Sequence, residues 1–232
     1  MRILTLLAAA LMMSGCLSSR AATEPRDLVV LVHGMGRSPL SMAPLQISLQ
    51  RAGYRVLNVG YDSQEPSIAE IGAQLGNEVD AALVEEPAPQ VHYVGHSLGT
   101  VAIRWHLIHE DPPSTVGRAV FLAPPNQGAR SADRLARWVG WALPPIRELG
   151  RTGIASNLGP PPGVDVAVIA GDRDGKVTVA ETCLEGAAHA VVPSTHTFIM
   201  MRPRVMGMVQ SFLATGVLPS ANAATCANDL GA

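Results

Sequence analysis

The chain has 232 residues, of which 47% are hydrophobic and 16% are charged, and its formal net charge at pH 7 is −2. This length and apolar content suit one domain with a single core, and they exclude an intrinsically disordered chain. The sequence has no long basic or acidic run, so its charge pattern does not favour nucleic acid as a partner. The composition gives no indication of the oligomeric state.

The N-terminus has the pattern of an export signal. Arg2 precedes an apolar stretch, Ile3–Met13, whose 11 residues are too few to cross a bilayer but suit a signal peptide. A buried N-terminal helix is the alternative interpretation. We expect residues 1–15 to be a signal peptide and residues 16–25 to be a linker.

The residues that follow this stretch resemble a bacterial lipobox, the motif in which a cysteine is lipidated and becomes the new N-terminus. The match covers Met13–Cys16, with Met13 where Leu is usual. On this interpretation Cys16 anchors the protein in a membrane, and Leu17 in place of Asp indicates the outer membrane. Cleavage near Ala21 or Ala22 would instead give a free periplasmic or secreted protein.

Six apolar segments alternate with segments of helical periodicity, which predicts a parallel sheet with helices on both faces. The expected strands are Leu28–Val32, Tyr54–Val59, Val91–Val94, Ala119–Ala123, Val164–Ala170 and Ala188–Val192. The expected helices are Leu40–Ala52, a segment that opens at Pro66 and Ser67, Leu98–Ile108, Ala132–Trp141 and Met201–Leu213, the last with Pro203 at its start.

These elements predict one α/β domain over residues 26–216, followed by a loosely packed tail over residues 217–232. The only sizeable insertion is Pro124–Gly163, so we expect no large cap domain. Trp138 and Trp141 in this insertion are compatible with a membrane-facing or substrate-facing patch and equally with core packing.

The strongest chemical motif is Gly95-His96-Ser97-Leu98-Gly99, which lies between an expected strand and an expected helix. In this context a G-x-S-x-G sequence forms a strained turn that exposes the serine, and the glycines allow close packing of the helix. We therefore predict that Ser97 is a nucleophile and that the Leu98 N–H faces an oxyanion.

A second glycine-rich turn, His33-Gly34-Met35-Gly36, follows the first expected strand. It can supply the Met35 N–H as the other oxyanion-hole donor. The alternative is a phosphate-binding loop, but the dinucleotide fingerprint G-x-G-x-x-G is broken by Pro39.

An acid and a base follow the last two expected strands. Asp172 and Asp174 lie in the turn Gly171–Val177, and His196 follows the sixth strand. The chain order Ser, Asp, His is the order of a serine-hydrolase triad on this type of sheet.

Residues 26–214 resemble the α/β-hydrolase fold of small bacterial lipases and esterases, including lidless lipases and lipase-like deacylases. Two further stretches are similar to this family, Asn58–Ser63 and Ala123–Gly128. The family's turn G-x-x-D-x-x-V matches Gly171, Asp174 and Val177, so the resemblance implies Asp174 rather than Asp172 as the triad acid. It implies hydrolysis of a small-molecule or lipid ester through an acyl-enzyme on Ser97, with no cofactor.

Two other functions remain alternatives at this stage. The same triad could transfer the acyl group to an alcohol or amine, and a surface lipoprotein with a vestigial site belongs to a different class. A metal site on His92 with His96, or on His106 with His109, is disfavoured, because most of these positions are explained by an expected strand, the G-x-S-x-G turn or an expected helix.

The three cysteines fit an exported protein. If Cys16 carries lipid, Cys183 and Cys226 form an even pair in an oxidising compartment. We expect a disulfide between these two residues, with two free thiols as the alternative.

Overall fold

In the computed structural model, residues 25–219 and Cys226 are described. This part of the chain forms one six-stranded sheet in the order β2-β1-β3-β4-β5-β6, with every neighbouring pair parallel. The strands are β1 (Leu28–Val32), β2 (Arg55–Val59), β3 (Val91–His96), β4 (Val116–Leu122), β5 (Asp165–Gly171) and β6 (Ala188–Val192). The predicted parallel sheet is therefore confirmed.

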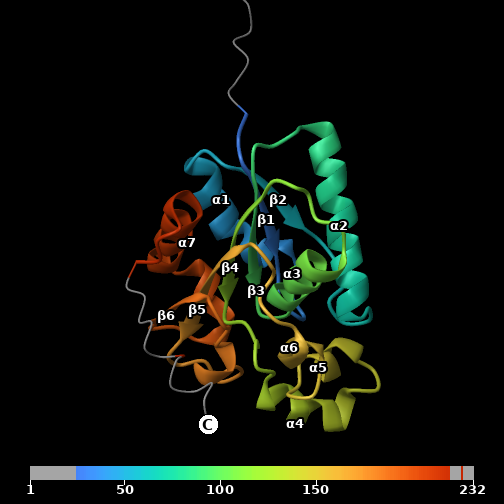
Figure 1. The fold of residues 1–232 in the computed structure, drawn as a ribbon. Coiled ribbons are helices and arrows are strands. Elements are labelled where there is room, and N and C mark those ends of the chain that lie inside the picture. The colour runs from blue at the N-terminus through green and yellow to red at the C-terminus, as the bar shows by residue number, and fades with distance from the viewer. Residues whose placement is uncertain (1–24, 220–225, 227–232) are drawn as a thin grey trace, which may run out of the picture.

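Helices cover both faces of the sheet, as predicted. Figure 1 shows α1 and α7 on one side, α2 and α3 on the other, and α4 to α6 beyond one end of the strands. The α-helices are α1 (Ala43–Arg51), α2 (Ile68–Glu85), α3 (Leu98–His109), α4 (Arg130–Val139), α5 (Pro144–Glu148), α6 (Ile154–Asn157) and α7 (Pro203–Thr215). Three short 3₁₀ helices accompany them: η1 (Pro39–Met42), η2 (Ala180–Thr182) and η3 (His196–Met201).

The alternation of side chains along each strand builds two core layers. In β1, Val29 and Leu31 pack with residues of α1 and α7, whereas Val30 and Val32 pack with residues of α2 and α3. Successive side chains of a strand point to opposite faces, and helices cover both faces here. This explains why the strands are continuous apolar runs rather than alternating ones.

Helix boundaries follow local chemistry where a cap or a proline is present. Ser67 caps α2, and a reciprocal contact with Glu70 completes a capping box. Pro203 is the first residue of α7, and the residues before it form η3. The expectation that Pro203 defines the start of the closing helix is therefore confirmed, since proline favours the first helical position.

The insertion after β4 differs most from the sequence-based expectation. One helix is expected there, over Ala132–Trp141, but α4 begins two residues earlier and ends at Val139, and α5 and α6 follow it. Trp138 and Trp141 are 81% and 80% exposed, so the core-packing interpretation of these residues is wrong. Within residues 25–219 this insertion adds three short helices but no separate cap domain.

The start of the tail packs more closely than expected. Leu218 is buried and belongs to the core layer formed with α7, because Gly216, directly after α7, has a left-handed conformation that turns the chain back. In the described residues no helix is both long and apolar enough to span a membrane. The predicted signal peptide and most of the linker, with Cys16, lie outside the described residues.

Candidate active site

Ser97 occupies a strained turn between β3 and α3. Its φ of 52° is a left-handed value that non-glycine residues rarely adopt. A Cβ on Gly95 would lie 2.8 Å from the Thr100 backbone nitrogen, and one on Gly99 would clash with the Val32 and His33 carbonyl oxygens. The two glycines therefore let α3 pack against β1 while the turn presents the serine side chain.

His196 and Asp174 complete a hydrogen-bonded chain with Ser97. His196 Nε2 lies 3.0 Å from Ser97 Oγ, and His196 Nδ1 lies 2.7 Å from Asp174 Oδ2. A carboxylate only accepts hydrogen bonds, so Nδ1 carries the proton and Nε2 can accept the serine hydroxyl. The structure thus brings together the three residues that the sequence singles out, from the turns that follow β3, β5 and β6.

Asp174 is held ionised in a buried position. Its burial acts to raise the pKa, but hydrogen bonds from His196, Val177 and Lys176 outweigh this effect and leave the pKa below its ordinary value. The backbone N–H groups of Lys176 and Val177 both donate to Asp174 Oδ1, at 2.8 and 2.9 Å. These donors leave the second carboxylate oxygen free to orient His196.

Asp172 lies in the same turn but has a different role. Its Oδ1 accepts a hydrogen bond from the Ser194 N–H at 3.1 Å and contacts Arg173. It therefore holds the turn before His196 without touching the imidazole. The geometry favours Asp174 as the triad acid, the assignment that the family's turn pattern implies.

Two free backbone N–H groups lie near the serine, one in the turn after β1 and one at the start of α3. Among the described residues, neither the Met35 N–H nor the Leu98 N–H donates to an acceptor. A Cβ on Gly34 would lie 3.2 Å from Ser97 Cβ, so this turn approaches the serine closely. Such free donors at a helix start and an adjacent turn suit a developing oxyanion.

Residues after β2 brace that turn. The Tyr61 hydroxyl donates to the His33 carbonyl oxygen, and the two rings stack with centroids 4.2 Å apart. The Ser63 hydroxyl accepts a hydrogen bond from the Gly36 N–H at 2.9 Å. The stretch Asn58–Ser63 therefore contributes to the site by holding the turn after β1, and none of its residues lines the pocket at Ser97.

His96, which precedes Ser97 in the G-x-S-x-G motif, is a buried part of the site whose role the sequence does not predict. Burial lowers its pKa to about 3, and the nearby His196 acts in the same direction. His96 lines the pocket beside Ser97, and its Nε2 lies 2.9 Å from the His196 carbonyl oxygen. It is therefore a neutral side chain that supports the backbone at His196.

A largely apolar pocket of about 210 Å³ opens onto Ser97 and His196. For scale, an apolar cavity of about 150 Å³ holds a benzene molecule. The apolar lining comes from the turn after β1, the insertion after β4 and the turn after β5: Met35, Pro125, Ala129, Ala132, Leu135, Ile146, Leu149 and Val177. Arg37 and Lys176 are its charged lining residues. The size and lining suit a short or medium acyl chain.

Two buried charged residues attach the insertion to the rest of the fold, and the sequence gives no signal for either. The Glu181 carboxylate accepts the N–H of Arg130 at 2.9 Å and that of Thr178 at 2.8 Å. Arg104 is fully buried on α3, where it donates to Asn126 and to the Ala155 carbonyl. Burial lowers the pKa of Arg104 to about 10. Glu181 thus holds the start of α4, which lines the pocket, and Arg104 holds the insertion against α3.

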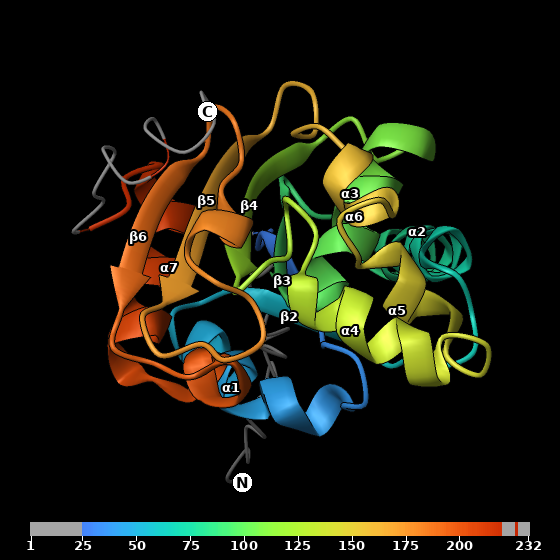
Figure 2. The ribbon, with the colours of Figure 1, turned by 90° about the horizontal axis from the view of Figure 1, so that it is seen from below.

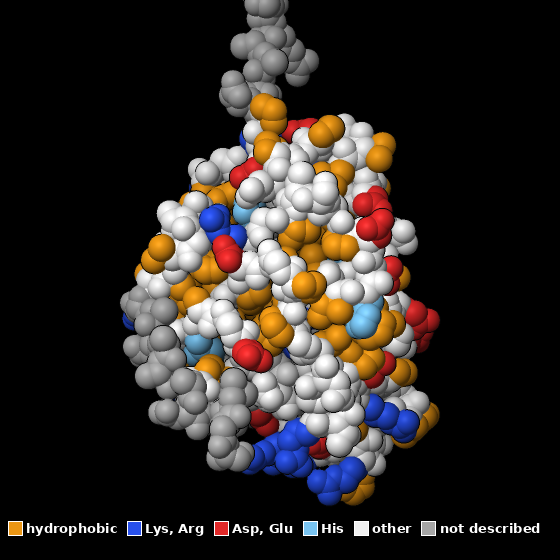
Figure 3. Space-filling model, in the orientation of Figure 1, with side chains coloured by type: hydrophobic (Ala, Val, Ile, Leu, Met, Phe, Trp, Pro, Cys, Tyr) orange, Lys and Arg blue, Asp and Glu red, His pale blue; other side chains and the backbone are white. Residues whose placement is uncertain are grey.

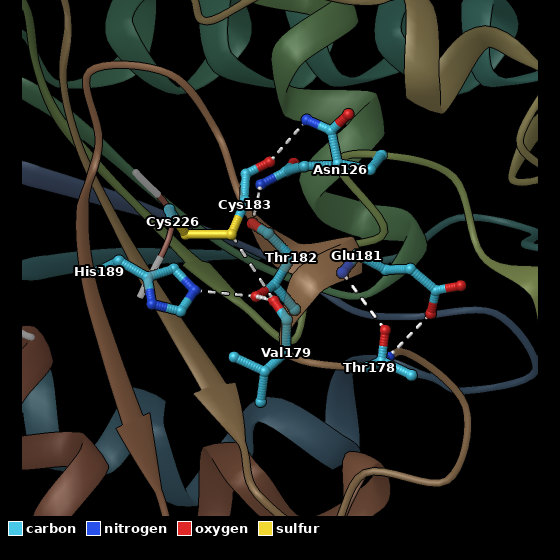
Figure 4. Close-up of a disulfide and its surroundings, with 9 residues drawn as sticks. Asn126, Thr178, Val179, Glu181, Thr182, Cys183, His189 and Cys226 are labelled. Atoms are coloured by element: carbon cyan, nitrogen blue, oxygen red, sulfur yellow. Dashed lines mark hydrogen bonds between the residues drawn. A yellow bond between two sulfur atoms is a disulfide. The ribbon is translucent and has the colours of Figure 1, made fainter. Parts of the chain in front are cut away.

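A disulfide joins Cys183 to Cys226, 43 positions apart in the chain (Figure 4). Cys183 follows η2, and its carbonyl accepts a hydrogen bond from Gln127. The bridge therefore ties the C-terminal region to the segment between Asp174 and β6. His189 lies beside it and contacts the Thr182 hydroxyl at 2.9 Å.

The histidine pairs considered as metal ligands have other partners. His92 Nδ1 accepts the Arg118 N–H, and His106 Nε2 contacts the Tyr93 hydroxyl. Among the described residues, the one cluster with metal-ligating side chains is Cys183, Cys226 and His189, and its two sulfurs form the disulfide.

The fold and the site geometry define a class of protein. A family model of the α/β hydrolases matches residues 29–216. The chain therefore belongs to the α/β-hydrolase family, and the resemblance seen in the sequence is confirmed.

Several solved structures share this fold. The mature lipase BlEst2 of Bacillus licheniformis superposes with a TM-score of 0.67 at 18% identity, covering 76% of this chain and 87% of that one. An esterase of Pyrococcus furiosus gives 0.64 at 17% identity, covering 82% of each chain. An esterase of Exiguobacterium antarcticum gives 0.64 at 15% identity, covering 82% of this chain and 93% of that one. At these identities the likeness shows the fold alone. No sequence among the curated proteins matches this chain significantly.

Proposed function

We propose that this α/β hydrolase is a serine esterase that cleaves carboxylic esters through an acyl-enzyme on Ser97. The observation that carries the proposal is the hydrogen-bonded chain from Ser97 through His196 to Asp174, placed at an apolar pocket. Family membership and the esterase and lipase neighbours support hydrolase chemistry.

The mechanism follows from the positions of the protons. His196 Nε2 takes the Ser97 proton as Oγ attacks the ester carbonyl, and Asp174 stabilises the cationic imidazole. The N–H groups of Met35 and Leu98 then stabilise the oxyanion. His196 returns the proton to the leaving alcohol. Water resolves the acyl-enzyme in a second step, with His196 as the base again. No cofactor takes part in this scheme.

The pocket bounds the substrate on its acyl side. A volume of about 210 Å³ accommodates a short or medium acyl chain, whereas drug-sized ligands occupy sites of roughly 300–1,000 Å³. We therefore expect the alcohol part of the ester to lie outside the pocket.

The test combines a nucleophile variant with a covalent probe. Ser97→Ala should keep its circular dichroism and lose turnover of p-nitrophenyl esters by several orders of magnitude. A fluorophosphonate should label the wild type and not this variant. Ser131→Ala removes the other serine of the pocket lining and should leave labelling intact. Residual turnover within tenfold of wild type in Ser97→Ala would contradict the proposal.

We also propose that Cys16 carries a lipid that anchors the mature protein in the outer membrane. The support is the sequence Met13–Leu17 alone, in which Cys16 is the lipidation position and Leu17 indicates the outer membrane. Cys16→Ser should release the protein from membranes in its native host. An unmodified mature N-terminus near Thr23, observed by mass spectrometry of the wild type, would show that the protein is free after export.

A further inference from the structure

An exposed hydrophobic ridge runs along and beyond α4. Leu135, Trp138 and Trp141 are 45%, 81% and 80% exposed, and they follow one another at a spacing of three residues. Large aromatic side chains are usually well buried in soluble proteins, and grouped exposed ones mark interaction sites. We refer to these three residues as the α4 ridge.

Positive charge surrounds the α4 ridge. The segment from residue 130 to residue 151 carries five arginines, all exposed, and two acidic residues, whereas the whole chain has a net charge of −2. Among the described residues, no acidic group lies within ion-pair distance of Arg134, Arg137 or Arg147. Figure 3 shows Lys and Arg side chains gathered at the end of the molecule that α4 to α6 form, with hydrophobic side chains among them.

The ridge is continuous with the mouth of the pocket. Leu135 belongs both to the ridge and to the pocket lining. A second exposed hydrophobic residue, Phe198, follows the lining residue Thr197 directly and is 53% exposed. Figure 2 views the molecule from this end, with α4 and α5 beside the carboxyl ends of the strands. Whatever binds the ridge therefore lies at the entrance to Ser97.

The rest of α4 is fixed to the protein. Ala132 is buried, and Asp133 forms an ion pair with Arg151 at 3.0 Å. The Arg130 N–H is held by the Glu181 carboxylate. These contacts hold α4 in place against the protein, while its exposed face carries the α4 ridge.

We propose that the α4 ridge and its flanking arginines dock the protein on an anionic lipid surface. Tryptophan prefers the boundary between headgroups and acyl chains, and arginine on the polar face of an amphipathic helix attracts anionic headgroups. A second copy of this chain is a poorer occupant, since a two-fold contact would bring the same uncompensated arginines together. Docking on the lipid surface does not require catalysis. That this surface also supplies the ester substrate to Ser97 is a further step, and only that step rests on the proposed function.

The experiment uses the full chain carrying Cys16→Ser and Ser97→Ala, so neither a lipid anchor nor turnover contributes. Binding is measured by co-sedimentation with vesicles of phosphatidylcholine, and with vesicles that also contain phosphatidylglycerol. The parent should bind the anionic vesicles more tightly, and added salt should weaken this binding. Trp138→Ala with Trp141→Ala should reduce binding at least tenfold. Arg134→Gln with Arg137→Gln should reduce it about thirtyfold on anionic vesicles.

A matched control lies on α2, where Val84 is 86% exposed. Val84→Ser should bind as the parent does. Quenching of tryptophan fluorescence by brominated lipid gives a second measurement, in which the α4 ridge stays intact. Trp138→Phe with Trp141→Phe keeps the ridge hydrophobic but should abolish this quenching. Equal binding by the parent and the Trp138→Ala, Trp141→Ala variant would overturn the proposal. So would self-association of the parent that this variant abolishes. Neither outcome bears on Ser97, which the esterase test addresses separately.

Discussion

His96 Nε2 donates a hydrogen bond to the backbone carbonyl oxygen of His196, 2.9 Å away. A carbonyl only accepts, so His96 carries its proton on Nε2, and its low pKa keeps it neutral. This bond joins the end of β3 to the turn that holds the proposed catalytic base, across 100 positions of sequence.

We predict that His96 positions His196 without touching the reacting atoms. His96→Leu should lower kcat for ester hydrolysis by about 10- to 100-fold with a smaller change in KM, since small displacements of a catalytic group are costly. His96→Gln can place an amide N–H near the position of Nε2 and should recover most of the rate. His106→Gln, at a buried histidine bonded to Tyr93, should lose stability but keep kcat. Equal kcat in the Leu and Gln variants of His96 would disprove the positioning role.

Substitution of the two aspartates in the turn after β5 should have clearly different effects on kcat. Asp174→Asn should reduce kcat by about 10⁴, because the amide no longer selects the tautomer that leaves Nε2 free to accept a proton. Asp172→Asn keeps an oxygen that can accept the Ser194 N–H, so its kcat should remain within a fewfold of wild type. Steady-state kinetics of both variants, with melting curves as a check of folding, test this assignment. A larger loss in Asp172→Asn would reverse it.

The glycines of the elbow are predicted to be structurally required, in contrast to a glycine elsewhere. Gly99→Ala would place a methyl group against the Val32 and His33 carbonyl oxygens, and we expect a loss of at least about 3 kcal/mol or failure to fold. Gly207 is exposed on α7, where an added methyl group would have no neighbouring atom within 4 Å outside its own turn of helix. Gly207→Ala should raise the free energy of unfolding by about 0.5–1 kcal/mol. Urea denaturation of both variants gives the comparison, and a stable, active Gly99→Ala protein would contradict the geometry.

The protein should lose stability steeply in mild acid. Burial lowers the pKa of five histidines in the folded state: His33, His92, His96, His106 and His189. The unfolded chain binds these protons near pH 6.5 and the folded chain only at lower pH. Stability is therefore full above about pH 6.5 and falls as the pH drops, by up to about 1.4 kcal/mol per pH unit for each group until the pH reaches its folded-state pKa, which for His96 is about 3.

Urea denaturation at a series of pH values measures this dependence. His106→Gln removes one of the buried histidines and should make the slope between about pH 6.5 and pH 5 shallower. The titration of Asp174 does not contribute in this range, since its folded pKa lies below the ordinary carboxyl value. A free energy of unfolding that is constant between pH 7 and pH 5 would show that the histidines are not held neutral.

Local patterns predict the strands and the residues at their carboxyl ends. Each strand is an apolar run because both faces of the sheet are covered, and Ser97, Asp174 and His196 stand in turns that follow strands. Chain order and one glycine motif therefore suffice to bring them together. These signals lie within short stretches of sequence, and reading them requires no knowledge of contacts between distant residues.

The supports of the site depend on contacts between distant positions. Arg130 and Glu181 are 51 residues apart, and Glu181 has no sequence feature that separates it from a solvated loop residue. Arg104 has the appearance of an exposed helical arginine but is fully buried. The predicted start of α4 differs from the observed one for the same reason. The first N–H of the helix donates to the distant Glu181 carboxylate rather than to a neighbouring capping side chain.

The Glu181 carboxylate also constrains how the enzyme can respond to a surface. It accepts hydrogen bonds from the first residue of α4 and from the loop between Asp174 and η2. If α4 swung away as a lid, this buried carboxylate would lose a partner, at a cost of about 1–3 kcal/mol or more. Contact with lipid would therefore leave the conformation of the site unchanged and would change only the frequency of encounters between the site and its substrate. Progress curves should start without a lag, whether the ester is dissolved or lies in a vesicle.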